Sequence, residues 1–156
     1  MTAGHSPTVH AAAVLAGNRA VLIRGPAGSG KSRLALALIS AAQTGLIRFA
    51  RLVGDDRVEL EACHGSLLVR PAAALAGRIE LRGLGIRRLA YEPVAVVGLV
   101  VDLAAADAER LPEPSAAMIE GLRIPRLAVK SGDDPLPAIL AMLTASATPA
   151  TPEAGG

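Results

Sequence analysis

Short apolar runs that end at glycine alternate along this chain with stretches in which apolar residues recur at helical spacing. The run Ala20–Arg24 (AVLIR) ends at Gly25, and its branched apolar residues predict a buried strand. From Ser32 onward, leucine and isoleucine recur among alanines, which predicts a helix that ends near Gln43–Gly45. A second short strand is expected at Leu52–Val53, directly before Gly54-Asp55-Asp56.

The rest of the chain predicts a β-rich middle and a closing helix. Val94–Leu103 is β-branched at most positions up to Val101, which is typical of a strand covered on both faces. The other expected elements are a hairpin over 57–70, a strand–turn–strand unit over 79–89, a short helix within 111–121, a strand over 124–129 and a helix over 136–143. This order predicts an α/β domain with a mixed sheet.

Composition is consistent with one folded domain. The chain has 156 residues, of which 51% are hydrophobic and 19% charged, so it can bury a core. Its end, residues 145–156 (ASATPATPEAGG), consists mainly of small residues and proline, which cannot bury enough surface to offset the entropy of ordering. We therefore expect a domain over residues 1–144 and a disordered tail over residues 145–156.

Charge and aromatic content disfavour a nucleic-acid partner. The net charge is only +2, and aromatic residues make up 1% of the chain, so neither a basic face nor a stacking platform is indicated. The longest apolar run, Val94–Val101, is far shorter than the roughly 20 residues that span a bilayer. No secretory signal is evident at the N-terminus, and the single Cys63 cannot form an internal disulfide. These features predict a cytoplasmic protein without a membrane partner.

The most specific motif for chemistry is Gly25-Pro26-Ala27-Gly28-Ser29-Gly30-Lys31-Ser32, which matches G-x-x-x-x-G-K-[ST] in full. It follows a predicted strand and opens a predicted helix, as a phosphate-binding loop must. Its glycines allow backbone N–H groups to surround phosphate oxygens, Lys31 can reach the β- and γ-phosphates, and the Ser32 hydroxyl can bind Mg²⁺. All eight residues are therefore candidates for nucleotide binding, with ATP and Mg²⁺ as cofactors.

Asp55 and Asp56 follow the next predicted strand. P-loop proteins place the acid that handles Mg²⁺ or its water at such a strand end. If strand geometry continues through the pair, the two side chains point in opposite directions, so that one faces the metal and the other the incoming nucleophile. The alternative interpretation of this pair is an exposed Asp-Asp turn.

A third segment, Glu80-Leu81-Arg82-Gly83-Leu84-Gly85-Ile86, completes a pattern with His10 ahead of the loop and Val53–Asp56 after it. Together these residues resemble the C-terminal catalytic domain of HPr kinase/phosphorylase. The resemblance covers about residues 8–143 and implies that family's α/β P-loop fold. It also implies an ATP- and Mg²⁺-dependent kinase that phosphorylates a serine of the phosphocarrier HPr and reverses the reaction with inorganic phosphate.

The resemblance also assigns roles to individual residues. His10 matches the active-site histidine, Asp56 the group that accepts the serine proton and returns it in the reverse reaction, and Arg110 the catalytic arginine. Glu80 matches a magnesium ligand, beside Ser32 and the candidate Asp55. The expected partner is an HPr-like phosphocarrier, and the family's hexamer is the expected assembly.

Two departures from the family pattern refine this interpretation. Family members carry an additional N-terminal domain, so the chain resembles a short form that consists of the catalytic domain. The family's P-V-R-P-G-R-like loop is replaced by Ala128-Val129-Lys130-Ser131-Gly132-Asp133, which favours the kinase reaction over the phosphorylase reaction. A small-molecule P-loop kinase and a non-catalytic nucleotide-binding regulator remain as alternatives.

Overall fold

The elements below come from a computed structural model that describes residues 8–108 and 115–145. Its helices are α1 (Lys31–Gln43) and α2 (Leu136–Ala145), and a 3-10 turn covers Ala73–Leu75. Its strands are β1 (Thr8–His10), β2 (Ala12–Ala16), β3 (Arg19–Arg24), β4 (Ala50–Gly54), β5 (Arg57–Cys63), β6 (Ser66–Pro71), β7 (Arg78–Leu81), β8 (Gly85–Arg88), β9 (Ala95–Asp102), β10 (Ser115–Ile119) and β11 (Leu122–Ala128).

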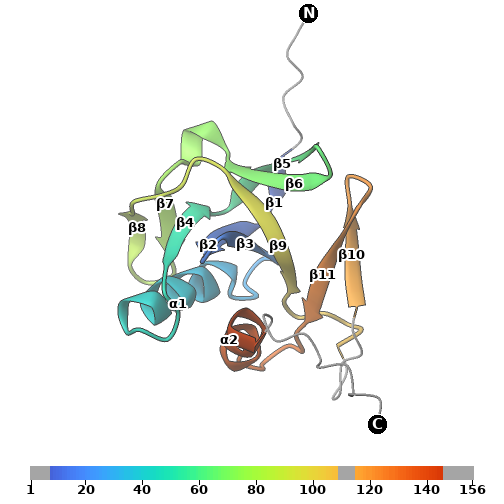
Figure 1. Cartoon of the computed structure of the whole chain (residues 1–156). Helices are drawn as coiled ribbons and strands as arrows, with labels where there is room; N and C mark the ends of the chain where they lie inside the picture. The colour runs from blue at the N-terminus through green and yellow to red at the C-terminus, as the bar shows by residue number, and fades with distance from the viewer. Residues whose placement is uncertain (1–7, 109–114, 146–156) are drawn as a thin grey trace, which may run out of the picture.

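The strands form one curled mixed sheet and one separate hairpin (Figure 1). The main sheet runs in the order β1-β5-β6-β9-β3-β2-β4, β11 joins it beside β9, and β7 pairs only with β8. Strand β9 is the centre of this arrangement. One of its edges pairs in parallel with β3, whereas the other pairs with β6 near its start and with β11 at its end.

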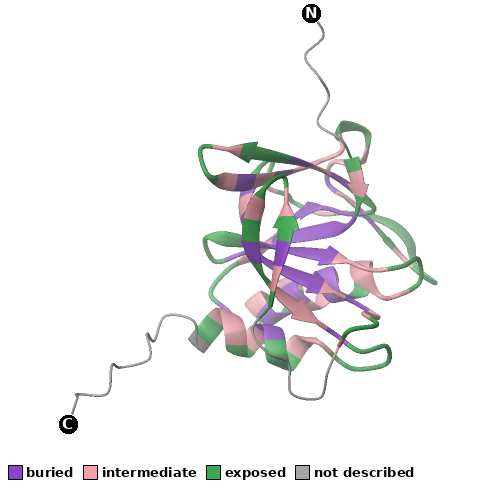
Figure 2. Cartoon of the chain, turned by 90° about the vertical axis from the view of Figure 1, so that its right-hand side faces the viewer, coloured by how far each residue is buried: buried purple, intermediate pink, exposed green. Residues whose placement is uncertain are grey.

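Each face of the sheet packs a core of its own. Buried residues of α1 and α2 pack on one face against β2, β3 and β9, and buried residues of the β5–β6 hairpin cover the opposite face. The strands at the centre are accordingly the most continuously buried part of the molecule (Figure 2). Because β9 alternates between the two cores, its nearly unbroken apolar sequence is explained by cover on both faces.

Helix α1 forms where the sequence pattern places it. Leu34, Ala35, Leu38 and Ala41 are buried at a spacing that keeps them on one side of the helix, and alanine and leucine favour the helical backbone. The helix ends at Gln43, and a turn over residues 44–49 leads into β4. The predicted strand–loop–helix unit is confirmed.

Two sequence predictions about elements were wrong. Residues 115–121, where a short helix was expected, form strand β10 and a turn before β11; residues 111–114 lie outside the described part of the chain. Strands β1 and β2 were not predicted: β1 has only three residues, and the alanine-rich segment that forms β2 carries no strand pattern of its own. It pairs with β3 on one side and β4 on the other, so tertiary pairing sets its conformation.

The other predicted strands, the hairpins and the closing helix are confirmed within a few residues. Among the described residues, no helix is both long and apolar enough to cross a membrane.

Candidate nucleotide-binding site

The phosphate loop and the Asp55–Asp56 pair lie at one end of the sheet, where several strands terminate. Strands β3, β9 and β11 are parallel, so their carboxyl ends lie at the same edge, where Asp102 is paired with both Arg24 and Ala128. Strand β2 runs antiparallel to β3 and to β4, which brings the end of β4 and the start of β2 to that edge as well. Ligands of α/β sheets bind beyond the carboxyl ends of strands, and this is where the glycine-rich loop lies.

The loop between β3 and α1 leaves the N-terminus of helix α1 uncapped. Gly30 has a φ of 100°, in the left-handed region that favours glycine, and its carbonyl accepts the first helical bond from the N–H of Leu34 at 2.9 Å. No side chain caps the helix, and its first turn carries no acidic residue. The first N–H groups of α1 therefore keep their partial positive charge for an anion.

Gly25 occupies a position where a side chain would not fit. A Cβ atom there would lie 2.5 Å from the Ser29 hydroxyl oxygen and 3.1 Å from the Leu103 Cβ. The Ser29 hydroxyl is itself buried and has no hydrogen-bond partner among the described residues. Lys31 Nζ donates to the carbonyl oxygens of Gly25 and Pro26 at 2.8 and 3.1 Å. An ammonium group, a helix N-terminus and a glycine-rich loop are what bound phosphate groups require.

Ser32 and Asp55 are in direct contact. The Ser32 hydroxyl lies 2.8 Å from both carboxylate oxygens of Asp55, and the backbone N–H of Glu80 donates to Asp55 Oδ2 at 3.2 Å. The separate β7–β8 hairpin thus attaches to the site through Glu80, whose own side chain is exposed. The first turn of α1, the end of β4 and strand β7 therefore meet at the Asp55 carboxylate.

Burial raises the pKa of Asp55 above its ordinary value. Hydrogen bonds from Ser32 and from the backbone of Glu80 and Asp56 act in the opposite direction, and the charge of Asp56 adds to the rise. Asp55 is only 3% exposed, and the groups that contact it are neutral donors. A buried carboxylate that has no cation beside it among the described residues is a suitable neighbour for a divalent metal ion.

Asp56 lies next to Asp55 but faces solvent. Its φ of 69° is left-handed, and the N–H of Arg57 donates to the Asp55 carbonyl at 2.8 Å, so the chain makes a tight three-residue turn here. The N–H of Ala11 donates to the Asp56 carbonyl at 3.3 Å, and His10 pairs with Arg57 across β1 and β5. The backbone of His10 therefore lies beside that of Asp56.

The comparisons with known proteins point to the same family as these residues. A family model described as "HPr Serine kinase C-terminal domain" matches residues 3–129. This chain belongs to that family.

Individual relatives agree with this assignment. The HPr kinase/phosphorylase of Clostridium beijerinckii is 42% identical over 66 residues, which are 42% of this chain and 20% of that protein. That of Streptococcus thermophilus is 41% identical over 80 residues, which are 51% of this chain and 24% of that protein. The matches thus cover about a quarter or less of these relatives' length. The solved structure of the Hpr(Ser) kinase/phosphatase from Coxiella burnetii matches with a TM-score of 0.71 and 26% identity over 90% of both chains. The predicted P-loop α/β fold of the family is confirmed.

The sequence also predicted how the two aspartates are separated, and the structure corrects that prediction. Asp55 and Asp56 do face different surroundings, but strand alternation is not the cause: β4 ends at Gly54, and the left-handed turn at Asp56 separates the two side chains. Arg110 lies outside the described residues. In the described part of the chain, no three His, Cys, Asp or Glu side chains gather as a metal cluster. Mg²⁺ typically uses one or two carboxylates together with substrate phosphates, so Ser32 and Asp55 suit it without such a cluster.

A second carboxylate at the same edge was missed in the sequence. Asp102, at the end of β9, receives two hydrogen bonds from Arg24, at 2.7 and 2.8 Å, and one from Arg126 of β11. Burial alone would raise the pKa of Asp102, but the hydrogen bonds and charges of the two arginines bring it below its ordinary value. The sequence showed only an apolar strand that ends in aspartate. Nothing in the sequence indicated its arginine partners, which are 78 and 24 residues away.

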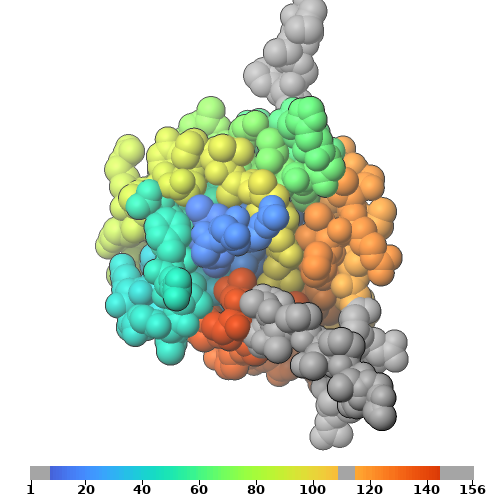
Figure 3. Space-filling view, viewed as in Figure 1, coloured from blue at the N-terminus to red at the C-terminus, as the bar shows by residue number. Residues whose placement is uncertain are grey.

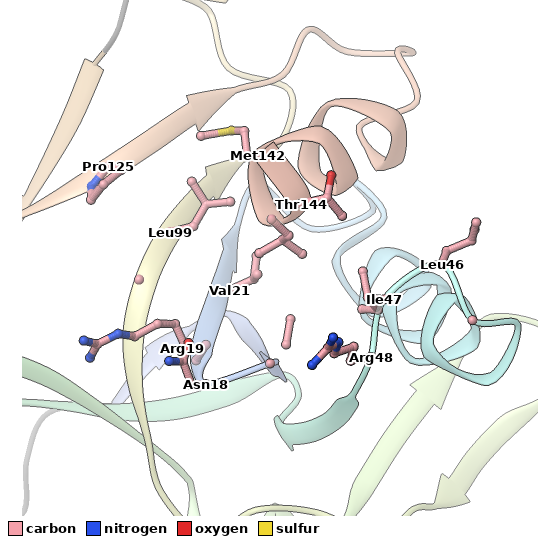
Figure 4. A pocket seen from close by; sticks show the side chains of 16 residues that line it. Asn18, Arg19, Val21, Leu46, Ile47, Arg48, Leu99, Pro125, Met142 and Thr144 are labelled. Atoms are coloured by element: carbon pink, nitrogen blue, oxygen red, sulfur yellow. The ribbon is translucent and has the colours of Figure 1, made fainter. Parts of the chain in front are cut away.

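A cavity lies away from this site. It has a volume of about 570 Å³ and lies at the opposite end of β3, between the β2–β3 turn, the α1–β4 connection and the end of α2. In the space-filling view, the blue atoms of this N-terminal region lie between the cyan, yellow and red-orange segments (Figure 3). Asn18, Arg48 and Met142 are among its lining residues (Figure 4), and none of the predicted site residues that the structure describes lines it. The phosphate loop is instead an open cradle of backbone, with Pro26, Ala27 and Gly28 exposed.

Proposed function

We propose that this chain transfers the γ-phosphoryl group of ATP, with Mg²⁺, to a serine hydroxyl of an HPr-type phosphocarrier protein. The observation that carries the proposal is the arrangement at the ends of β3 and β4. There the phosphate loop and the Ser32–Asp55 contact lie beside an exposed carboxylate, Asp56. Membership in the HPr serine kinase family supports the same reaction and partner.

The nucleotide phosphates would bind at the start of α1. The free N–H groups at the start of α1 and the Lys31 ammonium would be the donors for their oxygens. Lys31 Nζ now donates to two carbonyls of the loop, and phosphate oxygens would replace them as acceptors. Because phosphoryl transfer depends chiefly on positioning and on charge stabilisation, these groups supply most of what the reaction needs.

Ser32, Asp55 and Glu80 are the residues proposed to hold Mg²⁺. Ser32 and Asp55 are already 2.8 Å apart, and Glu80 is attached to Asp55 through its backbone N–H. Hydroxyl and carboxylate oxygens are the ligands that Mg²⁺ prefers. The metal, when bound, neutralises the phosphate charge that opposes transfer.

Asp56 is the proposed general base. Its exposed carboxylate accepts the proton of the serine hydroxyl while the serine oxygen bonds to the γ-phosphorus and the bond to the bridging oxygen of ADP breaks. His10, whose backbone lies beside Asp56, and Arg110 are proposed to assist at the transferred group. The reverse, phosphate-dependent reaction and the hexamer remain predictions from the family resemblance.

The test is transfer of label from γ-labelled ATP to a purified HPr-type protein from the same source, with Mg²⁺, by wild type and by Asp56→Asn. The amide keeps the shape of the side chain and loses its basicity, so the transfer rate should fall by about 10²–10⁴-fold. Binding of ADP, measured by calorimetry, should stay within about threefold of wild type, because Asp56 lies outside the phosphate loop.

A matched control is Glu61→Gln, which removes an exposed carboxylate of β5 whose partner is Arg70. It should transfer label as wild type does. Label on serine that is lost only in Asp56→Asn supports the proposal. Near-normal transfer by Asp56→Asn would overturn the general-base role. Nucleotide binding without any transfer by wild type would favour a small-molecule acceptor or a non-catalytic regulator.

A further inference from the structure

The Asp102 carboxylate is the centre of an ion-pair cluster that the proposed reaction does not use. Both of its oxygens accept hydrogen bonds from guanidinium groups: Arg24 donates from Nε and from a terminal nitrogen, and Arg126 donates from Nε. Arg126 continues the cluster with two bonds to Asp107, at 2.8 and 3.0 Å. The Asp102 side chain is 14% exposed and that of Arg126 17%, so water screens their contact weakly.

This cluster is adjacent to the first residue of the phosphate loop. Arg24 immediately precedes Gly25, and its carbonyl accepts the N–H of Leu103 at 2.8 Å. Leu103, the residue after Asp102, limits the space at Gly25: a Cβ atom on this glycine would lie 3.1 Å from the Leu103 Cβ and 3.2 Å from its carbonyl oxygen. The loop therefore leaves β3 at a point fixed by contacts with the end of β9.

The same carboxylate also connects β9 to β11. The Asp102 carbonyl accepts the N–H of Val129 at 2.8 Å, and Arg126 reaches Asp102 from β11. Three parallel strands thus meet at one residue. A carboxylate shared by two arginines has no oxygen left without a guanidinium donor, which distinguishes it from Asp55, whose partners are a hydroxyl and backbone N–H groups.

We propose that Asp102 is a positioning residue for the phosphate loop: by holding Arg24 and Arg126 it fixes the end of β3 against β9, and with it the loop geometry that binds nucleotide. It acts through Arg24 and Leu103 and contacts neither the metal nor the phosphates. The inference rests on the proposed function only in that the chain must bind a nucleotide. It holds whatever the acceptor of the phosphoryl group is.

The test compares binding of ADP with Mg²⁺, measured by calorimetry, in wild type and in Asp102→Asn. The amide cannot pair with two guanidinium groups, so Arg24 loses its fixed position and the Kd of ADP should rise about tenfold, which corresponds to about 1.4 kcal/mol. In the transfer assay, the KM for ATP should rise in parallel while kcat stays within about threefold. The Mg²⁺ concentration for half-maximal binding should not change, because Asp102 is not a ligand.

Two further variants separate positioning from general destabilisation. Arg24→Lys keeps the positive charge but loses the two-pronged contact with Asp102, so the Kd of ADP should rise about threefold. Because the charge is kept, this variant should lose less folding stability than Asp102→Asn. Glu61→Gln removes the Arg70–Glu61 ion pair of the β5–β6 hairpin and should leave the Kd unchanged. Each variant is measured at least 15 °C below its own midpoint of thermal unfolding, so that the unfolded fraction does not contribute.

The outcomes are distinct from those that test the proposed function. If ADP binds to Asp102→Asn and to Arg24→Lys with the wild-type Kd, the positioning role is wrong, even if wild type transfers phosphate to a phosphocarrier. A shift in the Mg²⁺ requirement of Asp102→Asn would also overturn it, since that result would make Asp102 a metal-handling group. If the Kd rises as expected but wild type transfers no phosphate to any HPr-type protein, the positioning role holds and the proposed acceptor is wrong.

Discussion

Asp55, directly after β4, and Asp102, the last residue of β9, lie at the same end of the sheet, on either side of β3 and its phosphate loop, yet their surroundings are opposite. Asp55 is 3% exposed and meets only neutral donors, Ser32 and backbone N–H groups. Asp102 is held by two arginines. Burial raises the pKa of Asp55, whereas the arginines overcome burial and lower that of Asp102.

The difference shows that a place at a strand end does not define the role of an acid. A carboxylate without a cation is costly to bury, and in the proposed reaction Mg²⁺ would offset the charge of Asp55. A carboxylate with two guanidinium partners is already neutralised and serves as a fixed point between strands. The following predictions test this distinction, from the largest expected effect to the smallest.

The largest effect is expected for phosphoryl transfer by Asp55→Asn. Asparagine keeps the hydrogen bonds, because its carbonyl can accept from the Glu80 N–H and its amide can donate to the Ser32 hydroxyl. It removes the charge that would attract Mg²⁺, so kcat should fall at least 100-fold and the Mg²⁺ titration should move to higher concentration. Measurement of the transfer rate over a range of Mg²⁺ concentrations checks this, and an unchanged titration would count against the metal role of Asp55.

An intermediate effect is expected for stability, with opposite signs at the two sites. At pH 7, Asp102→Asn should lower the free energy of unfolding by about 2 kcal/mol, because Arg24 loses its carboxylate partner and the partly buried Arg126 keeps only the exposed Asp107. Asp55→Asn should leave it unchanged or raise it by up to about 1 kcal/mol, because a buried charge is removed and its hydrogen bonds are kept. Urea denaturation of the three proteins measures both values. Equal losses of unfolding free energy in both variants would contradict the difference between the two acids.

The dependence of stability on pH should separate the two acids further. The lowered pKa of Asp102 means that its contribution is present above the ordinary value of 3.8 and is lost as the pH falls through its lower native value. The raised pKa of Asp55 means that the native protein holds a proton above 3.8 that the unfolded chain releases, so wild type loses stability as the pH rises through that window. The advantage of Asp55→Asn should therefore grow from pH 4 to pH 7, whereas the deficit of Asp102→Asn should shrink on acidification.

The sequence anticipated one of these two sites and not the other, for physical reasons. The phosphate loop, Ser32 and the Asp55–Asp56 pair were predicted because their chemistry is encoded by neighbouring residues with fixed spacing, and family membership is confirmed. The Asp102 cluster joins residues from β3, β9 and β11, and only the sheet brings these strands together. A long apolar strand that ends in aspartate indicated a carboxylate at this edge but not its partners.

The same contrast applies to the elements themselves. Helix α1 and strand β9 were predicted because their own periodicity specifies them. Strand β2 was missed because alanines owe their conformation here to pairing with β3 and β4. The turn at Asp56 also has no local signal: its left-handed φ follows from the need to leave β4 and enter β5 within a few residues.

The smallest effect is expected at the outer end of the arginine cluster. Asp107 binds Arg126 with good two-pronged geometry, but its side chain is 65% exposed, so solvent and salt screen the pair. Asp107→Asn should therefore shift the midpoint of thermal unfolding by no more than about 2 °C and leave the Kd of ADP within about twofold of wild type. Differential scanning calorimetry at low and high salt checks this, and the small shift should vanish at 0.5 M salt. A loss as large as that of Asp102→Asn would mean that Arg126 depends on Asp107 as much as on Asp102, and the fixed point would then belong to the whole cluster instead of to one buried carboxylate.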